Sequence, residues 1–390
     1  AMDCLKSLQK PLPDNAFYKA LPEWDGEGYS KNNTLEDVQT LREKLQEREM
    51  TPSIGSWEKL EGKINPTITK KNYKSKWFAI AAGFVGILII ASFIFNNDII
   101  NFENDIQIVD DSLEKAAIGL ADIIKVGFKG TLQDFFQFMK TDKQFYYKAD
   151  KQGKAAYLKK AVNLIDSMET RLDEIFITKP KASIIVKAVE SFREKSAGKA
   201  FYNRPAADGS RPGIYYANLY DMESMPIYQM EALAYHEGIP GHHMQLAIQQ
   251  ELKEVPLFRK FGGYTAYTEG WGLYSEFIPK EMGFYVDPYS DFGRLAMDLW
   301  RACRLVVDTG IHAKKWTREE GIAYYTENTP NAELDVIKMV ERHIVMPSQA
   351  TAYKIGMLKI LELRTKAKNA LGDQFDIRDF HEVVIAQGAI

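Results

Sequence analysis

His236 to Gln245 reads HEGIPGHHMQ, and this stretch decides how the rest of the chain is interpreted. A histidine followed by a glutamate, with more histidine one to two helical turns later, is typical of zinc hydrolases. In the usual His-Glu-x-x-His form the second imidazole stands four residues after the first, but Pro240 occupies that position. Proline lacks an N–H and crowds the preceding turn, so we expect the helix to kink or bulge there. The second ligand is then His242 or His243, unless the stretch is a histidine-rich helix junction without metal.

Length and composition predict a globular protein with chemistry in its C-terminal half. The 390 residues suffice for two or three domains, and 45% of them are hydrophobic and 26% charged. The net charge of -3 gives no indication of a nucleic-acid partner. With only Cys4 and Cys303, a disulfide framework and a cysteine-rich metal site are excluded. All six histidines lie at or after His236.

Residues 77–95 (WFAIAAGFVGILIIASFIF) form an uncharged apolar stretch of 19 residues. A helix needs ~20 apolar residues to cross a bilayer core, so we predict a transmembrane helix here. Lysines precede the stretch and acidic residues follow it, which places the N-terminus in the cytoplasm and later residues outside. We therefore expect a single-pass membrane protein whose C-terminal domain is extracytoplasmic, either periplasmic or at the cell surface. If the stretch is instead a buried core helix, the protein is cytoplasmic.

The predicted domain organisation has four parts. Residues 1–76 form a weakly ordered cytoplasmic segment with one short helix, 77–95 the transmembrane helix, 96–116 a linker, and 117–390 a helical domain. We expect a mainly α fold with a small β element. Helical periodicity and cap signals predict helices over 112–126, 131–139, 154–176, 224–237, 242–253, 265–279, 290–313, 317 onward, 332–345, 348–371 and 377–386.

Two short strands are predicted before the histidine stretch, over 184–189 and 211–219. An extended peptide can add to a strand that lies just upstream of a metal-binding helix. This makes Tyr215, within the second strand, a candidate substrate contact. A purely structural hairpin explains the same residues equally well.

Zinc in a hydrolase usually takes three protein ligands and leaves one position for water. Glu269, 26 residues after His243 and on a following helix, is the best candidate for the third ligand. Glu237 follows a ligand without being one, so we expect it to take the proton from the water that attacks a carbonyl. His312 and Tyr353 are candidate hydrogen-bond donors to the oxyanion that forms.

Arginines near the predicted site are candidates for binding a substrate carboxylate, because their planar forks match that group. The candidates are Arg211, Arg301 and Arg304. Taken singly, each of them is also explained by an ordinary salt bridge.

Six separated motifs occur in order over about 270 residues: Gly127–Thr131, Asp208–Gly213, His236–Glu237 with Pro240–His243, Glu269–Trp271, Arg304–His312, and Pro347–Ala350 with Tyr353–Gly356. From about Ala117 to the end, the chain resembles the C-terminal half of the bacterial family catalogued as domain of unknown function 885. That family is similar to the helical zinc peptidases of the gluzincin group. Residues 1–110 do not resemble the helical N-terminal half that family members usually have.

The resemblance implies a mostly helical gluzincin-like fold that holds Zn²⁺. The implied ligands are His236, His242 or His243, and Glu269, with Glu237 as the base. Angiotensin-converting enzyme is similar in layout, with a tyrosine and a histidine further on, which implies oxyanion-side roles for Tyr353 and His312.

The first functional hypothesis is a membrane-anchored zinc metallopeptidase that acts on short peptides. A second is a catalytically silent membrane-anchored binding protein that retains the metal site. A third is a hydrolase of a non-peptide amide or ester, because a metal site specifies attack on a polarised carbonyl and not what flanks it. The expected partners are a peptide or other small carbonyl substrate, and the membrane through residues 77–95.

Overall fold

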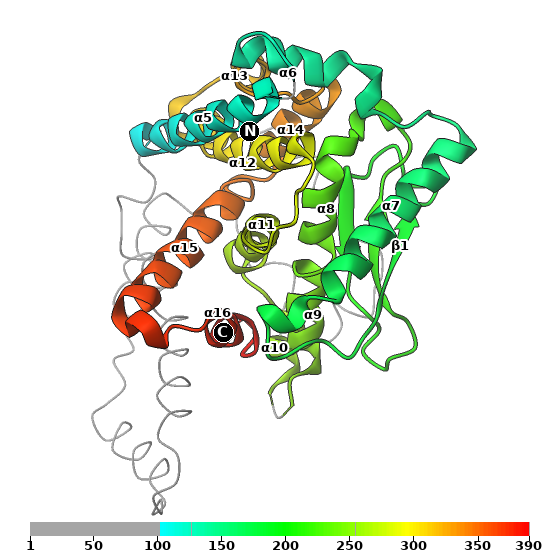
Figure 1. Ribbon diagram of the computed structural model, residues 1–390, viewed down its shortest axis with the longest axis vertical. Coiled ribbons are helices and arrows are strands. Elements are labelled where there is room, and N and C mark those ends of the chain that lie inside the picture. Colours follow the sequence, from blue (N-terminus) through cyan, green and yellow to red (C-terminus); the bar gives the residue numbers. More distant parts are fainter. Residues whose placement is uncertain (1–101, 126, 254, 390) are drawn as a thin grey trace, which may run out of the picture. The chain divides into compact units, whose positions relative to one another are not determined.

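The computed structural model describes residues 102–125, 127–253 and 255–389, which are mainly helical (Figure 1). The predicted cytoplasmic segment 1–76 and transmembrane helix 77–95 lie outside these residues. Among the described helices, none combines the length and the apolar character that a membrane span requires.

The helices are α5 (Phe102–Lys125), α6 (Leu132–Thr141), α7 (Lys151–Glu169), α8 (Met230–Glu237), α9 (His242–Glu251), α10 (Leu257–Phe261), α11 (Thr265–Glu281), α12 (Pro288–Lys314), α13 (Arg318–Asn328), α14 (Glu333–Val345), α15 (Ala352–Leu371) and α16 (Ile377–Ile385). The strands are β1 (Ile184–Ala188), β2 (Ala200–Asn203) and β3 (Gly213–Ala217).

The three strands form one sheet in the order β1-β3-β2, with β1 parallel and β2 antiparallel to β3. Both predicted strands are confirmed, whereas β2 was not predicted. All five residues of β3 are buried, as expected for a central strand. Because β3 is paired along both edges, a substrate peptide cannot add to it, and that expectation for 211–219 was wrong. Strand β2 is one edge of the described sheet, and β1 is the other.

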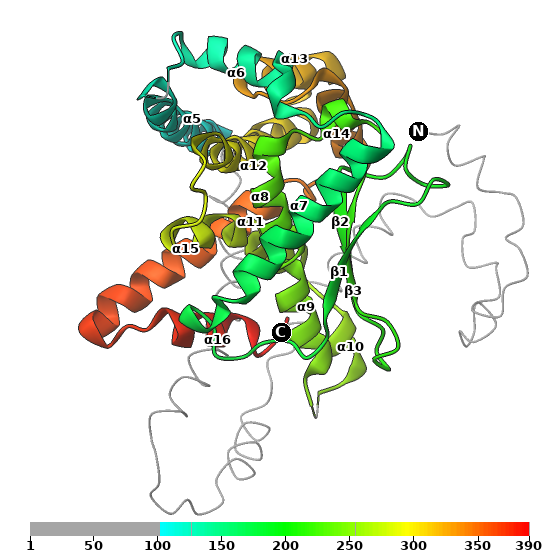
Figure 2. The same cartoon turned by 45° about the vertical axis from the view of Figure 1, so that its right-hand side comes forward.

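Two apolar clusters make up most of the core. One lies around the sheet with α7, α8, α11 and the inner side of α15. The other joins α5, α6, α12, α13 and α14, which gather at the top of Figure 1. Helices α7, α8 and α9 lie beside the strands (Figure 2). The candidate site residues come from elements that belong to both clusters.

Part of the predicted linker 96–116 is helical. Helix α5 begins at Phe102 and lies along α12 (Figure 1). Its buried side chains include Val109 and Ala116, and Gly119 stands so close to α12 that an added Cβ would lie 2.5 Å from Leu295. From Phe102 onward the chain is therefore part of the helical domain.

Local signals explain most helix ends, and tertiary packing shifts some of them. The capping boxes at Thr131 and Thr317 are present as predicted. The helix that carries His236 begins at Met230 rather than near Ser224, because two short 3₁₀ turns, at 222–224 and 227–229, come first. Helix α7 ends at Glu169 instead of continuing to residue 176.

Candidate metal centre

The helix breaks at Pro240, as predicted from the sequence. Helix α8 ends at Glu237 and α9 begins at His242. The link is held from outside, since the indole N–H of Trp271 donates to the Pro240 carbonyl at 3.0 Å. Gly241 is required at the turn, because a Cβ there would lie 2.0 Å from the His236 carbonyl oxygen. The break brings the rings of His236 and His242 to a centroid distance of 4.7 Å.

Glu269 reaches both imidazoles from α11. Its Oε2 lies 3.6 Å from His236 Nε2 and 3.3 Å from His242 Nε2. One ligand atom from each of these three residues lies within 4.8 Å of the others. Gly272 makes room for them, because a Cβ there would stand 2.7 Å from His236 Nε2. The three side chains are therefore close enough together to hold a metal ion.

His243 points away from this group. Its Nδ1 lies 2.9 Å from the Tyr202 hydroxyl and its Nε2 2.9 Å from the Ala182 carbonyl. Since a carbonyl only accepts, Nε2 carries the proton and Nδ1 accepts from the tyrosine. Both nitrogens are thus used inside the fold, and His242 is the second histidine of the candidate centre.

Glu276 orients His236 from behind. Its Oε1 lies 2.8 Å from His236 Nδ1 and 3.2 Å from Arg301 Nη2. In the neutral ring, with the proton on Nδ1, the Nε2 lone pair faces Glu269 and His242, which is the form that a metal requires. No role for Glu276 is predicted from the sequence, although the residue stands seven positions after Glu269, two turns along the same helix. Arg301, predicted to bind substrate, lines the cavity but is paired with Glu276.

The metal-free site is a strongly coupled set of charges. Burial alone would lower the pKa of His236, but hydrogen bonds that its ring donates to Glu269 and Glu276 raise that pKa to about 9. Burial likewise works against ionisation of Glu269, yet the two imidazoles hold its pKa well below the usual value. Burial raises the pKa of Glu237, an effect that the nearby histidines reduce. The pKa of Glu237 is thus raised while that of Glu269 is lowered.

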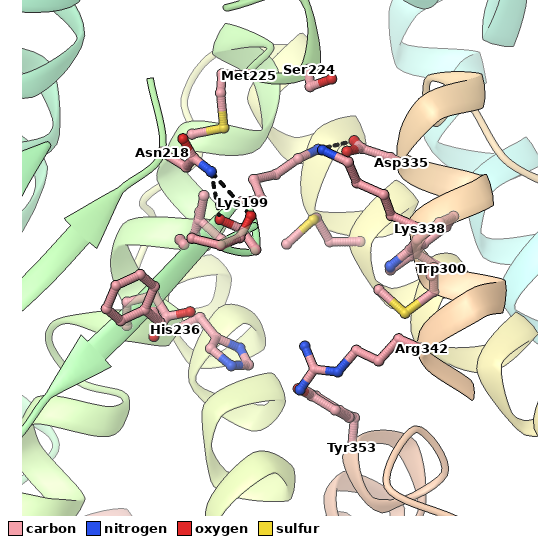
Figure 3. Close-up of a pocket in the computed structure, with 18 of the residues that line it drawn as sticks. Lys199, Asn218, Ser224, Met225, His236, Trp300, Asp335, Lys338, Arg342 and Tyr353 are labelled. Carbon is pink, nitrogen blue, oxygen red and sulfur yellow. Dashed lines mark hydrogen bonds and ion pairs between the residues drawn. The ribbon is translucent and has the colours of Figure 1, made fainter. Parts of the chain in front are cut away.

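The candidate centre opens into a cavity of about 990 Å³, whose wall includes His236, Glu237, His242 and Glu269. Tyr353 lines it from α15 (Figure 3), with its ring stacked on that of His236 at 6.1 Å and 24°. Gln349 donates to the Tyr353 oxygen at 3.4 Å, so the tyrosine's own proton is available to a ligand. Burial raises the pKa of Tyr353, which keeps that proton in place.

Three predicted site residues are not among those that line the cavity. His312 donates from Nε2 to the His343 carbonyl at 2.8 Å. Arg211 is exposed and donates to the Arg204 carbonyl at 2.7 Å. Tyr215 is fully buried within β3. His312 and Arg211 thus bond to backbone carbonyls of the fold, whereas the Tyr215 hydroxyl is buried without a hydrogen-bond partner in the described structure and the charge of Glu237 helps to raise its pKa.

A sequence profile described as "Bacterial protein of unknown function (DUF885)" matches residues 113–390. The structure is similar to one described as "The crystal structure of the putative lipoprotein from Colwellia psychrerythraea", with a TM-score of 0.72 and 38% identity over 79% of this chain and 53% of that chain.

It also shares its fold with "a putative lipoprotein of unknown function from Shewanella oneidensis", at a TM-score of 0.62 and 20% identity over 74% of this chain and 54% of the other. The chain thus spans about half the length of these two proteins. No curated protein matched it. Because the profile covers well over half of its length, the chain belongs to the DUF885 family of bacterial proteins of unknown function.

Proposed function

We propose that this chain is a zinc-dependent hydrolase, related to the gluzincin peptidases, that cleaves short peptides. One observation carries the proposal: two imidazole nitrogens and a carboxylate oxygen converge within 4.8 Å on the wall of a cavity that Glu237 also lines. Elsewhere in the described structure the imidazoles bond to tyrosines or backbone carbonyls, which makes this arrangement distinct.

The residues present fit zinc. Two histidines and one glutamate form a known catalytic zinc set, in which a fourth position stays open to water and substrate. The Glu276 carboxylate behind His236 is the outer partner that ligating histidines usually have. The same donor set also suits iron(II), whereas magnesium and calcium prefer oxygen ligands. Metal analysis therefore has to identify the ion as well as count it.

Zinc bound there would polarise a carbonyl and lower the pKa of water. Glu237 takes the proton of the attacking water, a role for which its burial-raised pKa suits it. Tyr353 donates its hydroxyl proton to the oxygen that gains negative charge. These two residues line the cavity from α8 and α15.

A peptide substrate is favoured by the sheet. Strand β2 ends the described sheet on its side, and Ala200, Phe201 and Tyr202 of this strand line the cavity. Its backbone is therefore placed to pair with an extended peptide, which gains main-chain hydrogen bonds without regard to sequence. A non-peptide amide or ester would not use this edge.

Glu237→Gln tests the proposal. Purified wild-type protein is expected to hold about one zinc per chain by mass spectrometry. The variant should keep the zinc and lose at least ~100-fold in hydrolysis of a short-peptide library, because only the base is removed. Glu169→Gln, an exposed change on α7, is the matched control and should retain full activity.

Zinc-free protein, or a fully active Glu237→Gln, would refute the hydrolase. Zinc without hydrolysis of any peptide, amide or ester would identify a silent binding protein, and cleavage of esters or non-peptide amides alone would reassign the substrate.

We further propose an extracytoplasmic location. The apolar residues 77–95 and the description of both similar structures as lipoproteins support it. Alkaline phosphatase fused after residue 390 in a bacterial host should be active if the domain is outside the cytoplasm, and inactive if it is inside.

A further inference from the structure

Arg304 is a buried cation with no carboxylate partner among the described residues. It is 7% exposed, and its Nε has no hydrogen-bond partner. Its guanidinium lies over the Tyr353 ring, 4.4 Å from the centroid, which orients the charge without neutralising it. Asp308, one turn further along α12, accepts instead from the Ser348 N–H at 3.0 Å. A buried charge is costly unless it is paired, so an arginine on a cavity wall indicates an anionic ligand.

Two more cations reach the same cavity from α14. Lys338 and Arg342 stand one helical turn apart and line the cavity, and Figure 3 shows both side chains extending from α14 into it. Neither forms an ion pair with a described residue, although neighbouring charges do. Lys199 pairs with Asp335 at 2.8 Å, as Figure 3 also shows.

The unpaired cations Arg304, Lys338 and Arg342 lie on α12 and α14, at one end of the cavity. The acidic residues of α14 that also line it, Asp335 and Glu341, are paired with Lys199 and Arg318. Glu237 and Glu269 lie at the other end, with the candidate metal ligands. Tyr353 connects the ends, because His236 stacks on its ring at 6.1 Å and Arg304 lies 4.4 Å from the same centroid. An extended chain advances ~3.3–3.6 Å per residue, so no more than about three residues separate the two ends.

We propose that Arg304, together with Lys338 and Arg342, binds the C-terminal carboxylate of the substrate, so that the enzyme removes pieces of one to three residues from the carboxyl end of peptides. This rests on the proposed peptidase function. The planar guanidinium of Arg304 matches a carboxylate as a two-bond fork. Lys338 and Arg342 add attraction from the solvent side, where a free chain end enters.

The test compares three peptides of one length on the zinc-loaded protein: a free acid, the same sequence as C-terminal amide, and an amide carrying glutamate as its last residue. The free acid should be cleaved with kcat/KM at least about tenfold above its amide, since hydrogen bonds to charged groups are strong. Mass spectrometry of the products should place the cut one to three residues from the C-terminus.

Variants connect the preference to the named residues. Arg304→Gln should raise KM for the free acid and bring its kcat/KM to within a few-fold of the amide. Lys338→Gln and Arg342→Gln, both at exposed positions where folding is not at risk, should each lower the acid-to-amide ratio in part. Lys160→Gln, an exposed lysine on α7 outside the cavity, is the matched control and should leave the ratio unchanged.

Three outcomes separate the two proposals. Glu237-dependent cleavage of acid and amide at equal rates overturns the carboxylate subsite and leaves the peptidase standing. Preference for the glutamate amide over the free acid overturns the terminal assignment in favour of a side-chain carboxylate. If no peptide is cleaved, the peptidase fails, and calorimetry decides the subsite: tighter binding of the free acid than of the amide to Glu237→Gln supports it, and equal binding overturns it.

Discussion

His236 owes its orientation to a carboxylate two turns beyond the candidate ligand Glu269 on the same helix. Glu276 is 2% exposed, accepts from His236 Nδ1 and also contacts Arg301. A buried carboxylate in this place fixes the ring and its tautomer, and it raises the basicity of the opposite nitrogen. If His236 binds zinc as proposed, its affinity for the ion therefore depends on a residue outside the set of ligands.

Glu276→Gln should weaken zinc binding by ~10–100-fold while the protein still folds, because the amide keeps the shape but loses the charge. Competition with a chromogenic chelator measures this. Glu281→Gln is the matched control on the same helix, where the side chain pairs with Arg364 near the surface, and it should leave zinc affinity unchanged. Equal affinity in the two variants would assign Glu276 a packing role only.

The sequence was enough to name His236 and Glu269 as candidate ligands, which the structure brings together, but not to choose between His242 and His243. The choice depends on where the helix restarts after Pro240. It also depends on Tyr202, 41 residues before His243, whose hydroxyl bonds to the His243 ring. The roles of Arg211 and His312 could not be predicted from the sequence either, because their partners are backbone carbonyls that only the fold brings near. Motif spacing indicates candidate ligands on adjacent helical turns, but which way a side chain points also depends on partners that are distant in the sequence.

Two glycines let α11 and α15 cross at close range, and this crossing sets the position of Tyr353 relative to His236. A Cβ at Gly270 would lie 2.5 Å from the Gly356 Cα, and a Cβ at Gly356 would lie 2.0 Å from the Ala266 carbonyl oxygen. Neither contact can be relieved by a side-chain rotation, since both involve backbone atoms. The cavity wall therefore depends on the absence of two side chains.

Gly356→Ala should lower the free energy of unfolding by about 1–3 kcal/mol, although alanine favours helix by about 1 kcal/mol. Urea denaturation measures the change, and peptide hydrolysis should fall with it as Tyr353 shifts. In the control Gly263→Ala, the nearest atom to the new Cβ is a Thr268 hydroxyl at 3.5 Å, so stability should stay within ~0.5 kcal/mol. A Gly356→Ala protein as stable as wild type would contradict the close crossing.

Helices with strong periodicity or cap signals, such as α11, α12 and α14, could be predicted to within a few residues. The start of α5 could not, because residues 102–111 are rich in acidic groups that resemble a linker. Only contact with α12 shows that Asp105 and Val109 are buried there. Strand β2 was missed for a similar reason, since four residues pair only because β3 is beside them.

Three buried histidines spread through the domain are held neutral, and together they make its stability depend on pH. Each bonds to a tyrosine hydroxyl: His243 to Tyr202, His343 to Tyr325 and His381 to Tyr274. His243 and His381 accept this bond, because their other ring nitrogen donates to a backbone carbonyl. Burial lowers their pKa values from 6.5 to about 4 for His243 and about 3 for His343 and His381. In the unfolded chain all three titrate near 6.5.

The zinc-free protein should therefore lose stability as pH falls below about 6.5. Between pH 6 and 5 the unfolded chain binds protons at these histidines while the folded protein does not, so unfolding is favoured. Each histidine contributes up to ~1.4 kcal/mol per pH unit, or roughly 4 kcal/mol per unit for the three. Urea denaturation across this range should show the slope, and His343→Gln and His381→Gln should each remove about a third of it. The two residues lie in different helices, α14 and α16, so the two variants test the effect independently. An unchanged slope in both would show that these buried histidines do not set the dependence of stability on pH.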